Sequence, residues 1–228
     1  MCRLEGRRPV PELVHLQGKC VLVTGSTTGI GEATLRLCVA AGARVMMHGR
    51  DARRASRLAR ELGRRVRISL GNLAEPAACD RLIRATIRAF GRLDGLVNNA
   101  AVTTRSDLET TDAPTFDRII AINLRAPLLL IRAALPHFRR QGNGVVVNIG
   151  SVNALCGENQ LLAYSVAKGG LMTLTRNLAD AHVKENIRFN QQSCGMQVSP
   201  DGSPSKTVRT RKRGSTNWLN PPGSCDGK

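Results

Sequence analysis

The sequence predicts a single α/β domain built on a doubly wound parallel sheet. Short β-like apolar runs alternate with longer amphipathic stretches over residues 19–183. A glycine-rich turn lies where the first apolar run passes into the first helical stretch. Strand–helix–strand units in steady alternation give parallel strands joined by right-handed crossovers. Such a sheet has helices on both faces and its ligand crevice at the carboxyl ends of the strands.

The expected elements follow one another with short connections. The apolar runs predict strands at 19–25, 43–49, 65–70, 93–100, 144–151 and 187–190. The amphipathic stretches predict helices at 30–42, 51–63, 75–90, 112–122, 125–140 and 162–184. Glycines 42 and 63 end the first two helices. After residue 198 we expect no further strand, so the sheet is predicted to lack a seventh strand.

Composition sets limits on the class of protein. At 228 residues the chain suits one well-buried domain, and with only 3% aromatic residues its core must consist largely of Ala, Val, Leu and Ile. No apolar run reaches the roughly 18–20 residues of a membrane span, and the charged N-terminal stretch lacks the apolar core of a secretory signal. We therefore expect a cytoplasmic protein without a membrane partner.

Cysteines and histidines give no metal signature. The seven cysteines are scattered without a C-x-x-C pair, which favours free thiols over disulfides or a structural metal. The histidines at 15, 48, 137 and 182 form no grouping that we interpret as a site.

The formal charge of +17 has two readings. Clustered Lys and Arg could neutralise the phosphates of a nucleic acid. Alternatively, most of the charge forms solvated helix faces, since it is spread over stretches such as 51–65. The one dense cluster is "RTRKR" at 209–213. We favour the second reading and expect no nucleic-acid partner.

Changes in amino-acid composition divide the chain into three parts. Residues 1–18 are predicted to be a loose leader and 19–198 the nucleotide-binding domain. Residues 199–228 are basic and rich in Pro, Gly and Ser, which predicts an irregular tail.

The glycine-rich turn "TGSTTGIG" (24–31) predicts phosphate binding. Gly25 allows a tight exit from the strand, Gly29 a close approach of a pyrophosphate, and Gly31 close packing of helix on sheet. The helix N-terminus offers free N–H groups and a positive dipole. A merely structural turn is the alternative, but the strand before and the helix after favour a nucleotide.

Five ordered motifs resemble the short-chain dehydrogenase/reductase family over about residues 17–195. They are the turn at 24–31, "NNAA" at 98–101, Asn123 in "IIAINLRAP", Ser151 followed by "YSVAK" from Tyr164, and "NIRFN" at 186–190. The resemblance implies a Rossmann fold and a nicotinamide cofactor. The residues implied to bind that cofactor are Gly25, Thr27, Gly29, Ile30, Gly31, Arg50, Asn72, Leu73, Asn99, Ala100, Tyr164 and Lys168.

The residue after the second strand bears on which nicotinamide cofactor is used. An acidic side chain there would bind the ribose hydroxyls, whereas this chain has Arg50, which can pair with a 2′-phosphate. We therefore favour NADP(H) over NAD(H), with a surface role for Arg50 as the alternative. Asn72 replaces the usual aspartate near the adenine. Ala101 replaces a glycine, which is tolerable unless the backbone needs a positive φ.

The resemblance also implies a catalytic set of Asn123, Ser151, Tyr164 and Lys168. Tyr164 and Lys168, four residues apart, lie on one face of a helix. A nearby ammonium and a positive nicotinamide ring would lower the pKa of the phenol, making it an acid–base group for a carbonyl or alcohol substrate. Ser151 would orient the substrate oxygen, and Asn123 would hold a relay water. By analogy alone, we expect a homodimer or homotetramer.

The C-terminal part departs from the family pattern. Cys194 stands where the family has a proline, although Gly195 is kept. The set of motifs favours an NADP(H)-dependent oxidoreductase. The altered C-terminus makes a catalytically impaired nucleotide-binding relative the alternative, and nucleic-acid binding through the basic tail is a less favoured one.

Overall fold

The computed structural model describes residues 15–195, 197–198 and 204–205. Contacts divide the chain into two compact units, Met1–Gly195 and Met196–Lys228. In the second unit, β7 (Gln197–Val198) and β8 (Pro204–Ser205) pair in antiparallel fashion. Most of the predicted leader and of the predicted tail, including the basic cluster at 209–213, lies outside the described residues.

The first unit alternates strands and helices as the sequence predicts. Its strands are β1 (Cys20–Val23), β2 (Arg44–Gly49), β3 (Val66–Leu70), β4 (Gly95–Asn98), β5 (Gly144–Ser151) and β6 (Ile187–Cys194). Its α-helices are α1 (Gly29–Ala40), α2 (Ala52–Leu62), α3 (Pro76–Phe90), α4 (Ala113–Ile120), α5 (Ala126–Gln141) and α6 (Leu162–Ala181). The remaining helical segments are η1 (Gly63–Arg65), the π-helical η2 (Ala121–Arg125), η3 (Val152–Ala154) and η4 (Val183–Glu185).

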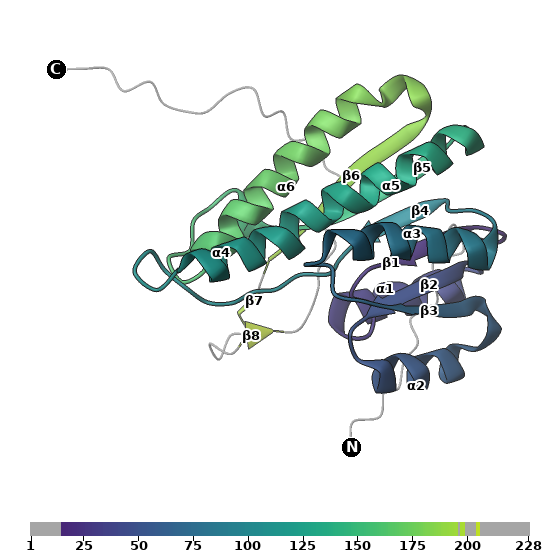
Figure 1. Ribbon diagram of the computed structural model, residues 1–228, viewed down its shortest axis with the longest axis horizontal. Helices are drawn as coiled ribbons and strands as arrows, with labels where there is room; N and C mark the ends of the chain where they lie inside the picture. Colours follow the sequence, from purple (N-terminus) through teal and green to yellow (C-terminus); the bar gives the residue numbers. More distant parts are fainter. Residues whose placement is uncertain (1–14, 196, 199–203, 206–228) are drawn as a thin grey trace. The chain divides into compact units, whose positions relative to one another are not determined.

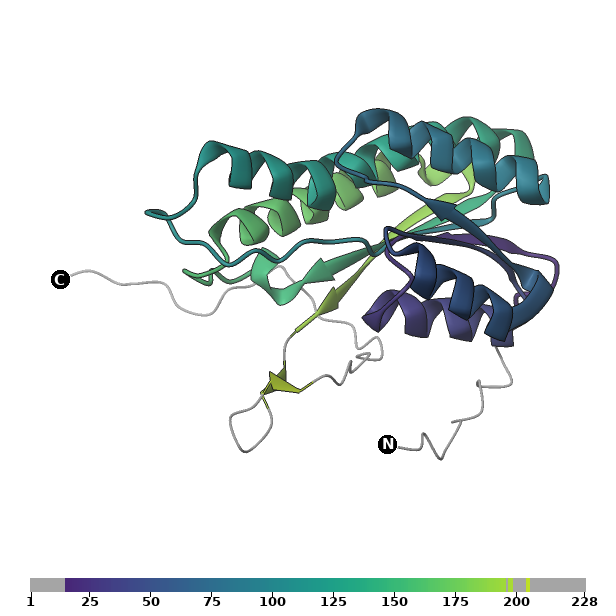
Figure 2. The ribbon, with the colours of Figure 1, turned by 60° about the horizontal axis from the view of Figure 1, so that its bottom comes forward.

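The six strands form one parallel sheet in the order β3-β2-β1-β4-β5-β6. The order reverses between β1 and β4, which is the point where a doubly wound sheet opens a crevice. Helices α1 and α2 cover one face, and α3, α5 and α6 cover the other (Figures 1 and 2). The predicted fold class is confirmed, and within the described residues no seventh strand joins this sheet.

Each face of the sheet has its own apolar core, and aliphatic residues dominate both. The face under α3, α5 and α6 buries a cluster that includes Leu22, Leu96, Leu130, Val146 and Phe138. The opposite face buries Val23, Leu35, Val45, Met47 and Leu58. The two clusters fix the helices on the sheet and so hold the strand ends in place.

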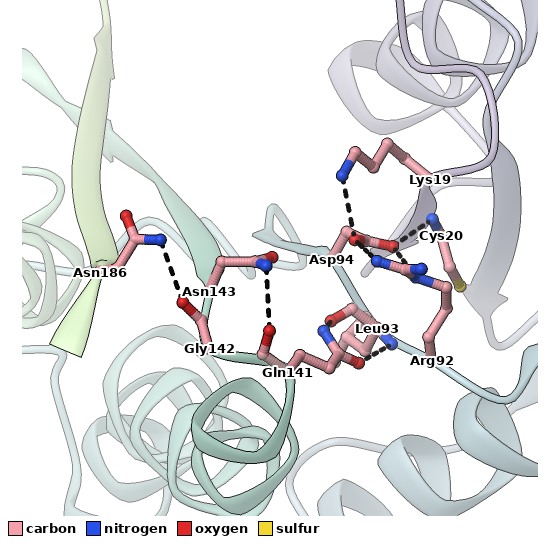
Figure 3. Close-up of polar contacts among 9 residues, drawn as sticks. All are labelled: Lys19, Cys20, Arg92, Leu93, Asp94, Gln141, Gly142, Asn143 and Asn186. Atoms are coloured by element: carbon pink, nitrogen blue, oxygen red, sulfur yellow. Dashed lines mark hydrogen bonds and ion pairs between the residues drawn. The ribbon is translucent and has the colours of Figure 1, made fainter.

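A polar network ties together the amino ends of β1 and β4 (Figure 3). The Asp94 carboxylate accepts hydrogen bonds from the Cys20 amide (2.9 Å) and from Arg92 Nε (2.8 Å). Gln141, at the end of α5, donates to the Leu93 carbonyl (2.7 Å) and accepts from the Leu93 amide (3.1 Å). This end of the sheet is opposite to the carboxyl ends, where a ligand is expected.

The predicted helices at 112–122 and 125–140 are joined into one helical stretch through η2. This stretch, Ala113–Gln141, is long and apolar enough to cross a membrane on length and composition alone, although the sequence analysis found no run of that kind. Half of its most apolar part is buried inside the domain, where Leu130, Ala134 and Phe138 belong to the core. Such burial is typical of a core helix in a globular protein.

Candidate active site

The glycines of the 24–31 turn are required by close contacts and by backbone conformation. Gly25 has a φ of +62°, and a Cβ there would lie 2.9 Å from the Cα of Ala100. A Cβ on Gly31 would lie 2.3 Å from the Gly25 carbonyl oxygen. Any larger residue at these two positions would push the turn away from the sheet.

The N-terminus of α1 presents amides that no side chain caps. Thr28 is the N-cap residue in an extended conformation, and its side chain accepts no capping hydrogen bond. Gly29 has a φ of +57°, and the space where its Cβ would lie holds no atom within 4 Å. The first-turn amides and the positive end of the helix dipole therefore face open space, an arrangement suited to an anion such as a phosphate.

A cavity of about 350 Å³ extends from this turn across the carboxyl ends of β1, β2, β3 and β4. It is lined by the predicted cofactor residues Gly25, Thr27, Gly29, Ile30, Arg50, Asn72, Leu73, Asn99 and Ala100. It is also lined by residues that the sequence analysis did not select, namely Thr28, His48, Gly49, Gly71, Ala101, Val102 and Ile122. Its residues and its place at the switch point suit the adenosine and phosphate part of a dinucleotide.

Thr24 and Asn99 connect the turn to the end of β4. The Thr24 hydroxyl accepts from the amides of Asn99 (2.9 Å) and Ala100 (3.0 Å). The Asn99 side chain donates to the carbonyls of Thr24 (2.9 Å) and Gly25 (3.0 Å). The side-chain nitrogen of Asn99 therefore holds the turn against the end of β4 and so shapes the wall of the cavity. Ala101 fits without strain, because the only described non-glycine residue with positive φ is Asn186.

His48, which the sequence analysis set aside, lies in this wall at the end of β2. It is only 4% exposed. Its Nδ1 accepts from the Gly25 amide (3.3 Å), and its Nε2 lies 3.2 Å from the Gly71 carbonyl oxygen. Burial, together with the positive charge of Arg50, lowers the pKa of His48 to about 4. A lone histidine in a strand gives no pattern, so only the fold reveals these contacts.

Three of the four predicted catalytic residues meet at the end of β5. Tyr164 and Lys168 lie one turn apart on α6, with the Lys168 Nζ 5.6 Å from the centroid of the Tyr164 ring. The same Nζ donates to the Ile149 carbonyl (2.6 Å) on β5. The Tyr164 hydroxyl shares a hydrogen bond with Ser151, the last residue of β5. The three side chains therefore face one another, outside the residues that line the nucleotide cavity.

Burial dominates the protonation of this group. It lowers the pKa of Lys168, which is only 2% exposed, to about 8. It raises the pKa of Tyr164 above that of a free phenol, an effect that Ser151 opposes. In the chain alone, burial and the nearby Cys194 raise the pKa of Tyr164, and only the Ser151 hydrogen bond lowers it. The predicted lowering also requires the positive nicotinamide ring and stays a prediction.

Asn123, the fourth predicted residue, has its side-chain amide bonded to the main chain of Val102. Its Oδ1 accepts from the Val102 amide (3.0 Å) and its Nδ2 donates to the Val102 carbonyl (2.8 Å). Asn123 lies in η2, and an α-helix would supply its carbonyl with the amide of residue 127. That residue is Pro127, which has no N–H. The Asn123 carbonyl therefore has no α-helical donor at residue 127, and its side chain is held by the main chain of Val102.

Strand β6 runs four residues further than predicted and brings Cys194 to this site. Cys194 is paired with Ser151 in the parallel register of β5 and β6. Its electrostatic interactions with Lys168 and Tyr164 show that it lies close to both. The thiol therefore occupies the position for which the sequence analysis noted the loss of a proline.

The fold and the cavity define a Rossmann-type domain with a phosphate-binding turn. The family model described as short chain dehydrogenase matches residues 19–206, and the chain belongs to this family. The match extends past the region of resemblance seen in the sequence and into the part of the chain after residue 198.

Named relatives agree with this assignment. An uncharacterized oxidoreductase of Thermotoga maritima is 33% identical over 90% of this chain and 79% of its own length. The 7alpha-hydroxysteroid dehydrogenase of Bacteroides fragilis is 30% identical over 82% of this chain and 74% of its own. A crystal structure of a Sinorhizobium meliloti protein, assigned as a short-chain alcohol dehydrogenase, matches with a TM-score of 0.77 and 30% identity. That match covers 80% of this chain and 74% of the other. The chain is thus similar to oxidoreductases along most of its length.

Proposed function

We propose that this protein is an NADP(H)-dependent oxidoreductase that transfers hydride between the nicotinamide and a carbonyl or alcohol substrate. The main support is the meeting of Ser151, Tyr164 and Lys168 beside a nucleotide-sized cavity that begins at a phosphate-binding turn. The cofactor would supply the hydride donor or acceptor. The open amides of α1 and the cavity lining fit its phosphates and its adenosine.

Each catalytic side chain has a role that its position suggests. The Tyr164 hydroxyl would exchange the proton of the substrate oxygen, and Ser151 would hydrogen-bond that oxygen. Lys168 is anchored on the Ile149 carbonyl, so its ammonium is held beside the Tyr164 ring. A water on the Asn123 main-chain carbonyl would connect this group with solvent. The catalytically impaired alternative, which the altered C-terminus suggested, gains no support from the relatives, since these are oxidoreductases.

Preference for NADP(H) rests on Arg50, which is exposed and lines the cavity next to the end of β2. Its guanidinium can pair with a 2′-phosphate in a way that no carboxylate could. Asp51, the next residue, caps the N-terminus of α2, where its carboxylate accepts a hydrogen bond from the Arg54 amide (3.0 Å). The charge at the cavity mouth is therefore positive.

Two further expectations belong to this proposal. A homodimer or homotetramer would cover apolar side chains that are exposed on α5 and α6, such as Leu128 (42% exposed) and Val166 (51%). The protein would act in the cytoplasm on a small-molecule substrate.

The proposal is tested first by cofactor binding. Isothermal titration of the purified chain should give tighter binding of NADPH than of NADH. Arg50→Ala should weaken NADPH binding about tenfold, leave NADH binding nearly unchanged and so remove most of that preference. A panel of carbonyl compounds, followed by loss of NADPH absorbance, then tests turnover, with Tyr164→Phe as the inactive variant. A chain that binds neither nucleotide would refute the proposal.

A further inference from the structure

His48 connects three strand ends around the nucleotide cavity. Besides the contacts of its ring with Gly25 and Gly71, its main chain binds Ser26 in both directions. The His48 carbonyl accepts from the Ser26 amide (2.8 Å), and the His48 amide donates to the Ser26 hydroxyl (3.1 Å). The side chain of Thr27 packs on the adjacent Gly49, where a Cβ would lie 2.6 Å from a Thr27 methyl. The turn after β1 is thus held from the end of β2.

The partners of the ring determine its tautomer. The Gly25 N–H can only donate, so Nδ1 must carry a lone pair. The Gly71 carbonyl can only accept, so Nε2 must carry the hydrogen. The ring is therefore a neutral Nε2–H imidazole that accepts on one side and donates on the other. No other uncharged side chain spans this gap with the same rigid pair of groups.

These contacts join the two halves of the adenosine site. Gly25 belongs to the phosphate turn, and Gly71 precedes the loop that contributes Asn72 and Leu73 to the cavity. We propose that His48 is a positioning residue for nucleotide binding, which fixes the phosphate turn relative to the 71–73 loop. This inference rests on the proposed function, because it assumes that the cavity binds a dinucleotide.

Replacement of His48 tests the inference in graded steps. His48→Phe keeps a ring but removes both hydrogen bonds, His48→Asn can retain an acceptor near Gly25, and His48→Gln can retain a donor near Gly71. His137→Gln on α5 is the matched control, since that histidine bonds to Arg140 and is outside the cavity. Isothermal titration with NADPH and with 2′,5′-ADP should give a dissociation constant about tenfold higher for His48→Phe and smaller increases for the other two.

A role in stability alone would give a different result. Measured well below each melting temperature, a purely structural histidine would leave the dissociation constants unchanged, and that outcome in folded His48→Phe overturns the proposal. If His48→Phe does not fold, unchanged dissociation constants in both His48→Asn and His48→Gln overturn it equally. A wild-type chain that binds neither probe would refute the proposed function instead.

The tautomer gives a readout that does not depend on the cofactor. Long-range ¹⁵N–¹H spectra of the wild-type chain should show the His48 ring as Nε2–H at neutral pH. An Nδ1–H ring or an imidazolium would overturn the arrangement from which the positioning role is inferred, whether or not NADPH binds.

Discussion

The buried imidazole of His48 makes the stability of the protein depend on pH. Its pKa falls from 6.5 to about 4 in the folded chain, mainly because burial disfavours the charged ring. Between these two values the unfolded chain binds more protons than the folded one, so the free energy of unfolding decreases as the pH falls. The loss of unfolding free energy begins near pH 6.5 and is complete below about pH 4.

The size of the effect follows from the shift. At about 1.4 kcal/mol per pKa unit, the complete loss is on the order of 3 kcal/mol, and about 2 kcal/mol of it occurs between about pH 7 and pH 5. For a domain of this size, that corresponds to a melting temperature lower by about 4–8 °C. Because the side chain is 4% exposed, solvent screens this contribution little.

The assay compares wild type with His48→Asn by urea unfolding at several pH values between about 5 and 7.5. Asparagine does not titrate, so the difference in unfolding free energy between the two proteins should narrow by about 2 kcal/mol toward pH 5. The histidines at 15, 137 and 182 are present in both proteins and cancel. A difference that stays constant over this range would show that His48 is not held neutral by the fold, and the reasoning would be refuted.

Three other substitutions probe separate parts of the molecule. Gly31→Ala places a methyl group against the Gly25 carbonyl, so it should lower the melting temperature and cost about 1–3 kcal/mol in urea unfolding; an unchanged midpoint would contradict the close packing of α1. Asp94→Ala leaves Arg92 and the Cys20 amide without their acceptor and should cost about 2–3 kcal/mol at neutral pH, whereas an effect below about 0.5 kcal/mol would mean that the network is dispensable. Lys168→Met removes a buried charge and should raise the free energy of unfolding by about 1–2 kcal/mol while abolishing turnover; lower stability would show that the bond to Ile149 outweighs the cost of burial.

Regular elements could be predicted wherever apolar residues recur with a clear period. Strand β5 was predicted with its observed bounds, 144–151, because it is apolar and bounded by glycine and turn residues. The sixth strand was predicted to end at Asn190 but continues to Cys194. Its last residues, Gln191, Gln192 and Ser193, are polar, and they are kept in the sheet by their backbone pairing with β5. A strand end made of polar residues and held by backbone hydrogen bonds cannot be predicted from the spacing of apolar residues.

The candidate site could be predicted where motifs place residues at strand ends, and less well where side chains act through the backbone. Of the turn residues predicted to bind the cofactor, Gly25, Thr27, Gly29 and Ile30 line the cavity together with Arg50, whereas Gly31 does not. His48 was missed, because its ring partners are a main-chain amide and a main-chain carbonyl in the segments that follow two other strands. Asn123 was predicted to hold a relay water, and in the structure its side-chain amide is bonded to the main chain of Val102, a contact that the sequence does not reveal. Main-chain amides and carbonyls are present whatever the residue type, so contacts made to them cannot be recognised from the sequence.

The two ends of the sheet differ in how their polar groups are satisfied, and the proposed site lies at the end where fewer of them have partners within the chain. At the amino end, burial alone would raise the pKa of Asp94, but the hydrogen bonds from Arg92 and the Cys20 amide prevail and lower it. At the carboxyl end, α1 has uncapped amides, and burial holds the pKa values of His48 and Lys168 well below their ordinary range. Shifted pKa values and uncapped amides of this kind are typical of functional sites. We therefore expect NADPH to stabilise the domain chiefly at its carboxyl edge, with hydrogen exchange slowing in the 24–31 turn and the 71–73 loop but not around Asp94. Equal slowing at both ends would contradict this division.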